Sequence, residues 1–126
     1  MLTTSQERII EIIREYSEDA PIVVEGTKDV AALNNLGIFE VVSVNAKGGP
    51  VGTVEFLEER RVKEIIILTD YDRRGEQLYA RIRELAISAG IAVNDVLRKK
   101  LREATHVKYI EDLARILGKE RGECIG

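Results

Sequence analysis

The sequence predicts an α/β fold with a central parallel four-stranded sheet, flanked by helices, and a basic helical tail at the carboxyl end. Short apolar runs rich in β-branched residues alternate with stretches whose apolar residues recur at helical spacing. The connections between them are short, as in right-handed crossover units. The chain has 126 residues, of which 44% are hydrophobic and 33% charged. We therefore expect one folded domain over residues 1–126, and neither a disordered nor a fibrous protein.

The first half of the chain contains two predicted strand–helix pairs. An amphipathic helix is expected over residues 4–16, because a threonine and a glutamate three residues later have the spacing of a capping box. Residues 22–24 form the first predicted strand, and residues 29–36 form the helix after it. The second strand is expected over residues 41–44, followed by a glycine-rich turn and a helix that begins at Pro50. The predicted buried face of that helix consists of Val51, Val54 and Leu57.

The second half supplies two more strands and the tail. Residues 64–69 form a largely apolar run, which is typical of a strand covered on both faces. A long helix is expected over residues 74–88, and a short fourth strand over residues 91–93. Residues 96–102 are predicted to be a basic helix. Thr105 is a candidate cap for a last helix, whose shared apolar face consists of Val107, Ile110, Leu113 and Leu117.

The composition excludes several kinds of catalytic, metal-binding and membrane-spanning site. The chain has one cysteine, Cys124, and one histidine, His106, so a disulfide, a structural zinc cluster and Ser-His catalysis are not expected. No apolar run approaches the roughly 20 residues of a membrane-spanning helix, and the first residues do not resemble a secretion signal. We therefore expect a cytoplasmic protein without a membrane partner.

The net charge of −3 conceals a segregation of charge along the chain. Residues 1–95 carry 11 cationic and 17 anionic groups, whereas residues 96–126 carry 8 cationic and 5 anionic groups. The acidity alone argues weakly against a polyanionic partner. Because residues 96–126 carry a surplus of positive charge, the overall acidity does not exclude a nucleic-acid partner.

Candidate chemistry follows three of the predicted strands. Glu25 ends the first strand, a loop containing Lys47 follows the second, and Asp70 and Asp72 follow the third. The carboxyl ends of parallel strands meet at one edge of a sheet, so these residues are expected to lie together. Asp70 and Asp72, two residues apart in an extended exit, would point to the same side and could hold one Mg²⁺, which prefers oxygen ligands.

Two segments resemble the motifs of the Toprim domain family. They are residues 23–29 (VVEGTKD) and residues 66–76 (IILTDYDRRGE), and the resemblance covers about residues 20–95. The family includes topoisomerases, bacterial primases, overcoming-lysogenization-defect nucleases, recombination mediators and the ribonuclease that matures 5S ribosomal RNA. The spacing is most similar to small stand-alone Toprim proteins, to the 5S RNA maturase and to primase-type domains. The resemblance implies a Rossmann-like Toprim core over residues 20–95, with residues 96–126 as a basic helical extension.

The resemblance also implies roles for individual residues. Glu25 matches the general acid or base of phosphodiester chemistry, and Asp70 and Asp72 match the pair that holds Mg²⁺, with Glu25 beside them and Mn²⁺ as a possible substitute. Asp29 matches an accessory acidic position. Three further matches are the turn glycines Gly26 and Gly75 and the looser phosphate-binding candidate Lys47, for which a plain turn is an equal alternative.

Basic side chains are the candidate nucleic-acid contacts. Arg73 and Arg74 begin the helix after Asp72, where they either face a phosphate or are simply solvated. The tail run is typical of a solvated helix face, but it is also the best candidate footprint for nucleic acid. Its members are Arg98, Lys99, Lys100 and Arg102.

Three functions remain open at this point. The first is a Mg²⁺-dependent enzyme of nucleic-acid phosphodiester chemistry, most plausibly a nuclease acting on RNA or DNA. The second is a non-catalytic Toprim module that binds metal and nucleic acid within a larger RNA or DNA processing complex, together with a protein partner. The third is a nucleotide-binding or regulatory protein. Because 126 residues leave no room for the nucleophilic tyrosine domain of a topoisomerase, we do not expect strand passage. Nor do we expect primase activity, which needs zinc-binding and helicase-binding parts.

Overall fold

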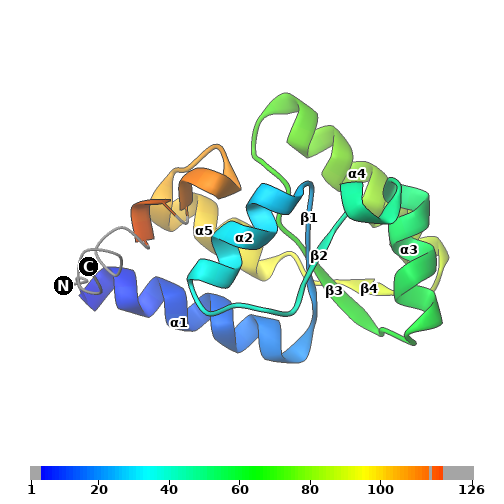
Figure 1. The fold of residues 1–126 in the computed structure, drawn as a ribbon, viewed down its shortest axis with the longest axis horizontal. Coiled ribbons are helices and arrows are strands. Elements are labelled where there is room, and N and C mark those ends of the chain that lie inside the picture. The colour runs from blue at the N-terminus through cyan, green and yellow to red at the C-terminus, as the bar shows by residue number, and fades with distance from the viewer. Residues whose placement is uncertain (1–3, 114, 118–126) are drawn as a thin grey trace.

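The computed structural model describes residues 4–113 and 115–117 (Figure 1). Cys124 and the end of the predicted basic extension lie outside the described residues. Helices cover both faces of a small central sheet, which confirms the predicted α/β class. Among the helices of the described residues, none has the length and apolar character needed to cross a membrane.

All strand pairs of the sheet are parallel, and their order is β2-β1-β3-β4. The strands are β1 (Ile22–Val24), β2 (Val41–Ser43), β3 (Glu64–Ile67) and β4 (Ala92–Val93). The chain moves from β1 to one side for β2 and then crosses back over β1 to place β3 on the other side. The strand order therefore reverses between β1 and β3, which is where open parallel sheets bind ligands.

The helices divide between the two faces of the sheet. On one face, α1 (Thr4–Asp19), α2 (Thr27–Asn35) and α5 (Val96–Thr105) pack in one apolar cluster, and on the other α3 (Pro50–Glu59) and α4 (Arg73–Ser88) pack in a second. Alternate residues of β1 and β3 belong to one cluster and then the other, because successive side chains of a strand point to opposite faces of the sheet. The five helices predicted between residues 4 and 102 are all present, with small differences at their ends.

The predicted buried face of α3 is partly wrong. Val54 and Leu57 are buried, but Val51 is 50% exposed, and Thr53 is fully buried in its place. The Thr53 hydroxyl donates to the Gly49 carbonyl at 2.8 Å, so this polar side chain carries no unsatisfied group into the core. The buried stripe is therefore centred on Thr53, Val54 and Leu57, and Val51 lies to one side of it.

The tail packs against the sheet instead of standing apart from it. Its predicted apolar residues all lie in the cluster that contains β1 and β3, as expected: Val107, Ile110, Leu113 and Leu117. Thr105 ends α5 and does not cap a further helix. Its hydroxyl donates to the Leu101 carbonyl at 2.6 Å, and His106 then reverses the chain in the left-handed region with φ 55°.

Candidate metal and nucleic-acid site

The edge of the sheet where β1 and β3 end carries the predicted carboxylates. Glu25 directly follows β1, and Asp70 and Asp72 follow β3. The exit of β2 fixes the turn at Glu25, whose carbonyl accepts hydrogen bonds from the Asn45 N–H at 2.9 Å and the Ser43 hydroxyl at 3.3 Å. Three consecutive strand ends therefore meet at the point of reversal.

Each of three aspartates at this edge uses one carboxylate oxygen to accept a backbone N–H. Within the described part of the chain, the second oxygen of each has no such partner, which leaves it available to a further ligand. The pairs are Gly26 N–H to Asp29 Oδ2 (3.1 Å), Ile110 N–H to Asp70 Oδ1 (2.8 Å) and Gly75 N–H to Asp72 Oδ1 (2.7 Å).

Burial and mutual repulsion raise the pKa of two of these aspartates. Partial burial is the main cause of the raised pKa of Asp29, and the nearby charges of Asp70, Glu25 and Glu111 add to it. Burial likewise raises the pKa of Asp70, with further contributions from Asp72 and Glu111. In each case a backbone N–H opposes the shift. The cluster thus holds more negative charge than its surroundings compensate, and a divalent cation would relieve this.

Among the described residues, Arg74 is the cation that pairs with Glu25. Its Nη2 lies 3.6 Å from Glu25 Oε1, and the Arg74 side chain is 84% exposed while that of Glu25 is 19% exposed. Such a long, exposed contact contributes little to stability. The guanidinium is therefore available to a phosphate at the same edge. Arg73 is also exposed at the start of α4.

Of the two motif glycines, Gly26 lies in the turn between β1 and α2, whereas Gly75 does not lie in a turn. Gly26 has an extended backbone with φ −127°, which any residue adopts. Gly75 lies within α4, where an added Cβ would stand 2.0 Å from the Asp70 carbonyl oxygen. Glycine at position 75 is thus explained by close packing against the Asp70 backbone and not by a special conformation.

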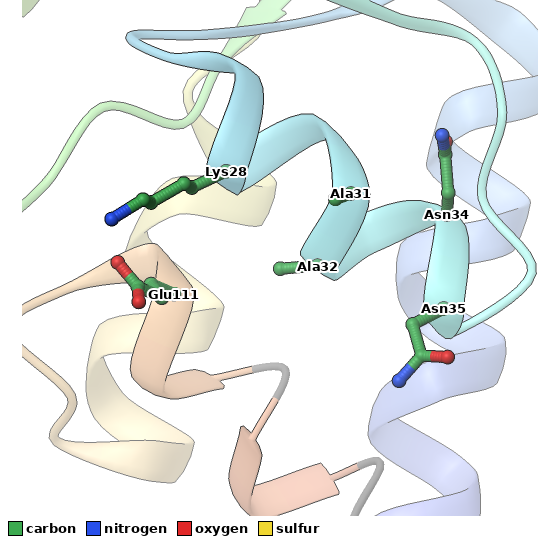
Figure 2. Close-up of a pocket in the computed structure, with 6 residues that line it drawn as sticks. All are labelled: Lys28, Ala31, Ala32, Asn34, Asn35 and Glu111. Carbon is green, nitrogen blue, oxygen red and sulfur yellow. The ribbon is translucent and has the colours of Figure 1, made fainter.

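Sequence reasoning missed the part that the tail plays at this edge. Besides the bond from Ile110, the Lys108 carbonyl accepts the Tyr71 N–H at 2.7 Å, so the tail is hydrogen-bonded to the exit of β3. Glu111 thereby joins the acidic cluster. Figure 2 shows Glu111 and Lys28 pointing toward one another across the mouth of a hollow beside α2. The only available signal was the helical spacing of the tail's apolar residues, which predicts a packed segment but not its position.

The predicted basic contacts differ in their surroundings. Lys99, Lys100 and Arg102 are exposed on α5, as a nucleic-acid surface requires. Arg98 is only 7% exposed and faces the core, so its assignment to that surface is corrected. Lys47 is half-buried, with its Nζ 3.9 Å from the centroid of the Phe56 ring, and its role toward phosphate stays a prediction.

The donor chemistry of the site fits magnesium. Among the described residues, no three His, Cys, Asp or Glu side chains form a ready-made metal centre. Mg²⁺ does not need one, because it keeps several waters and binds proteins through one or two carboxylates together with substrate phosphates. Asp70 and Asp72, each of which accepts one backbone N–H from the described residues, are the residues that would hold it.

Comparisons with known proteins identify the family of the chain. The Toprim domain family model matches residues 20–111. A UPF0292 protein of Methanocaldococcus jannaschii is 36% identical, with 90% of this chain and 92% of that protein covered. One from Methanosarcina acetivorans is 35% identical over 93% of this chain and 85% of its own length.

A solved structure supports the same assignment. A protein from Aquifex aeolicus superposes with a TM-score of 0.74 at 28% identity, covering 84% of this chain and 95% of that one. The chain therefore belongs to the Toprim family, and this membership implies a metal-dependent function related to nucleic acid.

Proposed function

We propose that this protein is a Mg²⁺-dependent nuclease that cleaves phosphodiester bonds of RNA or DNA. The observation that carries the proposal is that Glu25 follows β1 while Asp70 and Asp72 follow the adjacent parallel strand β3, beside the strand reversal. Within the described residues, each aspartate uses only one carboxylate oxygen to accept a backbone N–H. A hard cation and a phosphate are the ligands that suit such an edge.

The carboxylates have two different roles, metal binding and proton transfer. Asp70 and Asp72 would hold the metal. As water attacks the phosphorus and the bond to the leaving oxygen breaks, Glu25 would take the proton of the water or give a proton to the leaving oxygen. When bound, Mg²⁺, or Mn²⁺ in its place, polarises that phosphate and neutralises developing charge. Asp29 holds the turn after Glu25 by accepting the Gly26 N–H.

Exposed cations beside the carboxylates position the substrate backbone. Arg74 already lies next to Glu25, and its guanidinium presents the paired donors that match phosphate oxygens. Lys99, Lys100 and Arg102 on α5 supply further positive charge for a polyanion.

The test is cleavage of structured RNA and of DNA with Mg²⁺ or Mn²⁺. The Asp70→Asn, Asp72→Asn double variant removes both charges, but its amide oxygens can still accept the N–H groups of Ile110 and Gly75, so the variant should fold. We expect turnover to fall by at least about 100-fold. An Asp19→Asn control, at an exposed position at the end of α1, should cleave normally. Equal turnover by the double variant and wild type would refute the proposal.

A second candidate is a non-catalytic module that holds metal and nucleic acid inside a larger complex with a protein partner. In this case a partner would contribute further ligands or substrate contacts at the edge that carries Asp70 and Asp72. Nucleic-acid binding that weakens with salt, with no turnover under any metal, would support the module over the nuclease.

A further inference from the structure

One cation of the tail is buried where a solvated side chain was expected. Arg98 lies on α5 and is 7% exposed, and it is the only charged side chain in the buried class within residues 4–113 and 115–117. Burying an ionised group is costly unless hydrogen bonds and an opposite charge compensate it. The partners of Arg98 therefore indicate what the residue does.

All of these partners belong to the exit of β3 and the first turn of α4. Nη1 donates to the Thr69 carbonyl at 2.7 Å and, at a longer 3.5 Å, to that of Ile67. Nη2 donates to the Asp70 carbonyl at 3.1 Å and pairs with the Glu76 carboxylate. One guanidinium thus ties together the two segments that carry the candidate metal ligands.

Two tyrosine rings hold the guanidinium in place. Its Cζ lies 4.5 Å from the centroid of the Tyr71 ring and 4.7 Å from that of Tyr79. The Tyr71 hydroxyl in turn donates to the Arg98 carbonyl at 2.7 Å. A planar group packed on aromatic rings, with carbonyls around its edge, has little freedom to move.

The carbonyls of Thr69 and Asp70 have a particular need of this partner. β3 ends at Ile67, so these two groups have left the sheet while Thr69 is still buried, and buried carbonyls require a donor. Arg98 supplies this donor to both carbonyls, and the side chain of one of the two residues, Asp70, is a candidate metal ligand. The carboxylate of Asp70 is held separately, by the Ile110 N–H.

We propose that Arg98 is a positioning residue for the metal site: through Thr69, Asp70 and Glu76 it fixes the exit of β3 against α4 and so sets the placement of Asp70 relative to Asp72. This inference rests on the proposed metal site and deepens it. Arg98 does not contact substrate. The tail, expected only as a nucleic-acid footprint, thereby becomes part of the support of the carboxylates.

The test is calorimetric titration of the full chain with Mn²⁺ alone, at a temperature where circular dichroism shows every variant folded. Arg98→Gln should weaken Mn²⁺ binding by about 10- to 100-fold, as loss of a group that supports metal ligands does. Arg98→Lys keeps the charge but not the planar fork, and it should recover only part of the affinity.

Two further variants separate positioning from stability. Glu76→Gln weakens the ion pair between Arg98 and Glu76, and the Glu76 side chain is 55% exposed, so the variant should fold. Its affinity for Mn²⁺ should be several-fold lower than that of the wild type. Arg14→Gln is the control, because Arg14 also donates to a backbone carbonyl, that of Leu36, but at the opposite end of α2 from Asp29. It should lower the melting temperature and leave the affinity for Mn²⁺ unchanged.

The outcomes distinguish the two proposals. Wild-type affinity in folded Arg98→Gln and Glu76→Gln, while the Asp70→Asn, Asp72→Asn variant loses binding, overturns the positioning role alone. Failure of wild type to bind Mn²⁺ overturns the metal site and the positioning role with it. Loss of affinity in Arg14→Gln as large as in Arg98→Gln also overturns the positioning role, because general destabilisation would then explain both.

Discussion

Replacing Gly75 with alanine perturbs the candidate site through packing alone. An added Cβ would stand 2.0 Å from the Asp70 carbonyl oxygen and 2.5 Å from its carbon, against the 3.0 Å or more that real Cβ contacts show. The backbone of Asp70 and the first turn of α4 must therefore separate by about 1 Å. Hydrogen bonds hold Gly75 on both sides, since its N–H donates to Asp72 and its carbonyl accepts the Thr69 hydroxyl at 2.7 Å.

The expected cost combines three effects. Overpacking of a tight contact costs about 1–3 kcal/mol, and weakening the buried Thr69 bond adds about 1 kcal/mol. Alanine is the better helix former and returns about 1 kcal/mol. We therefore expect Gly75→Ala to lower the free energy of unfolding by about 1–3 kcal/mol. Because Asp70 moves relative to Asp72, Mn²⁺ binding should also weaken by at least about tenfold.

Denaturant unfolding and calorimetric Mn²⁺ titration measure the two effects. Gly26→Ala is the matched control, because its Cβ would meet only the Asn45 amide at 3.6 Å and the Asp29 carboxylate at 4.0 Å, both ordinary contacts. Because Gly26 is the N-cap of α2, Gly26→Ala should lower the free energy of unfolding by less than about 1 kcal/mol. It should leave the affinity for Mn²⁺ unchanged. The reasoning is refuted if Gly75→Ala matches Gly26→Ala in both stability and affinity.

Three further predictions concern the metal, an aspartate and the core. Saturating Mg²⁺ should stabilise the wild type, by about 2.7 kcal/mol at roughly 100 times its Kd, and a thermal melt should show no such gain in the Asp70→Asn, Asp72→Asn variant. Because the pKa of Asp29 is raised in the fold, its protonated form favours folding at low pH and that contribution is lost as pH rises through the folded pKa. Asp29→Asn should therefore stabilise the metal-free protein more at pH 7 than at pH 4 in denaturant titrations, and a reversed order would contradict this. Leu57→Ala should cost about 2–5 kcal/mol and the exposed Val51→Ala less than about 0.5 kcal/mol; equal losses would contradict the buried face assigned to α3.

Much of the fold follows from local sequence pattern. Apolar β-branched runs predicted the four strands, and helical spacing predicted the helices between them. The placement of Glu25 and of Asp70 and Asp72 after adjacent strands was also predictable, because parallel strands joined by short crossovers bring their carboxyl ends to one edge. The error at Val51 arose because the buried stripe of α3 includes Thr53. Thr53 is polar, so it was not expected to be buried, but its hydroxyl is hydrogen-bonded to the Gly49 carbonyl at the start of the helix.

The contribution of the tail was not predictable from such patterns. Arg98 belongs to a basic run whose other members are exposed, and only the tertiary fold places it beside carbonyls that have left the sheet. Ile110 likewise reaches Asp70 across 40 positions of sequence through a backbone N–H, which has no residue-specific signature. Long-range hydrogen bonds to the main chain are thus the part of this site that the sequence concealed.

The most direct test of the central claim is a crystal structure of the protein soaked with Mn²⁺, with the cation located by its anomalous scattering. The account predicts a peak at the edge between β1 and β3, within coordination distance of Asp70 and Asp72 and facing Glu25. A peak elsewhere, or none at a concentration that saturates binding in solution, would contradict it.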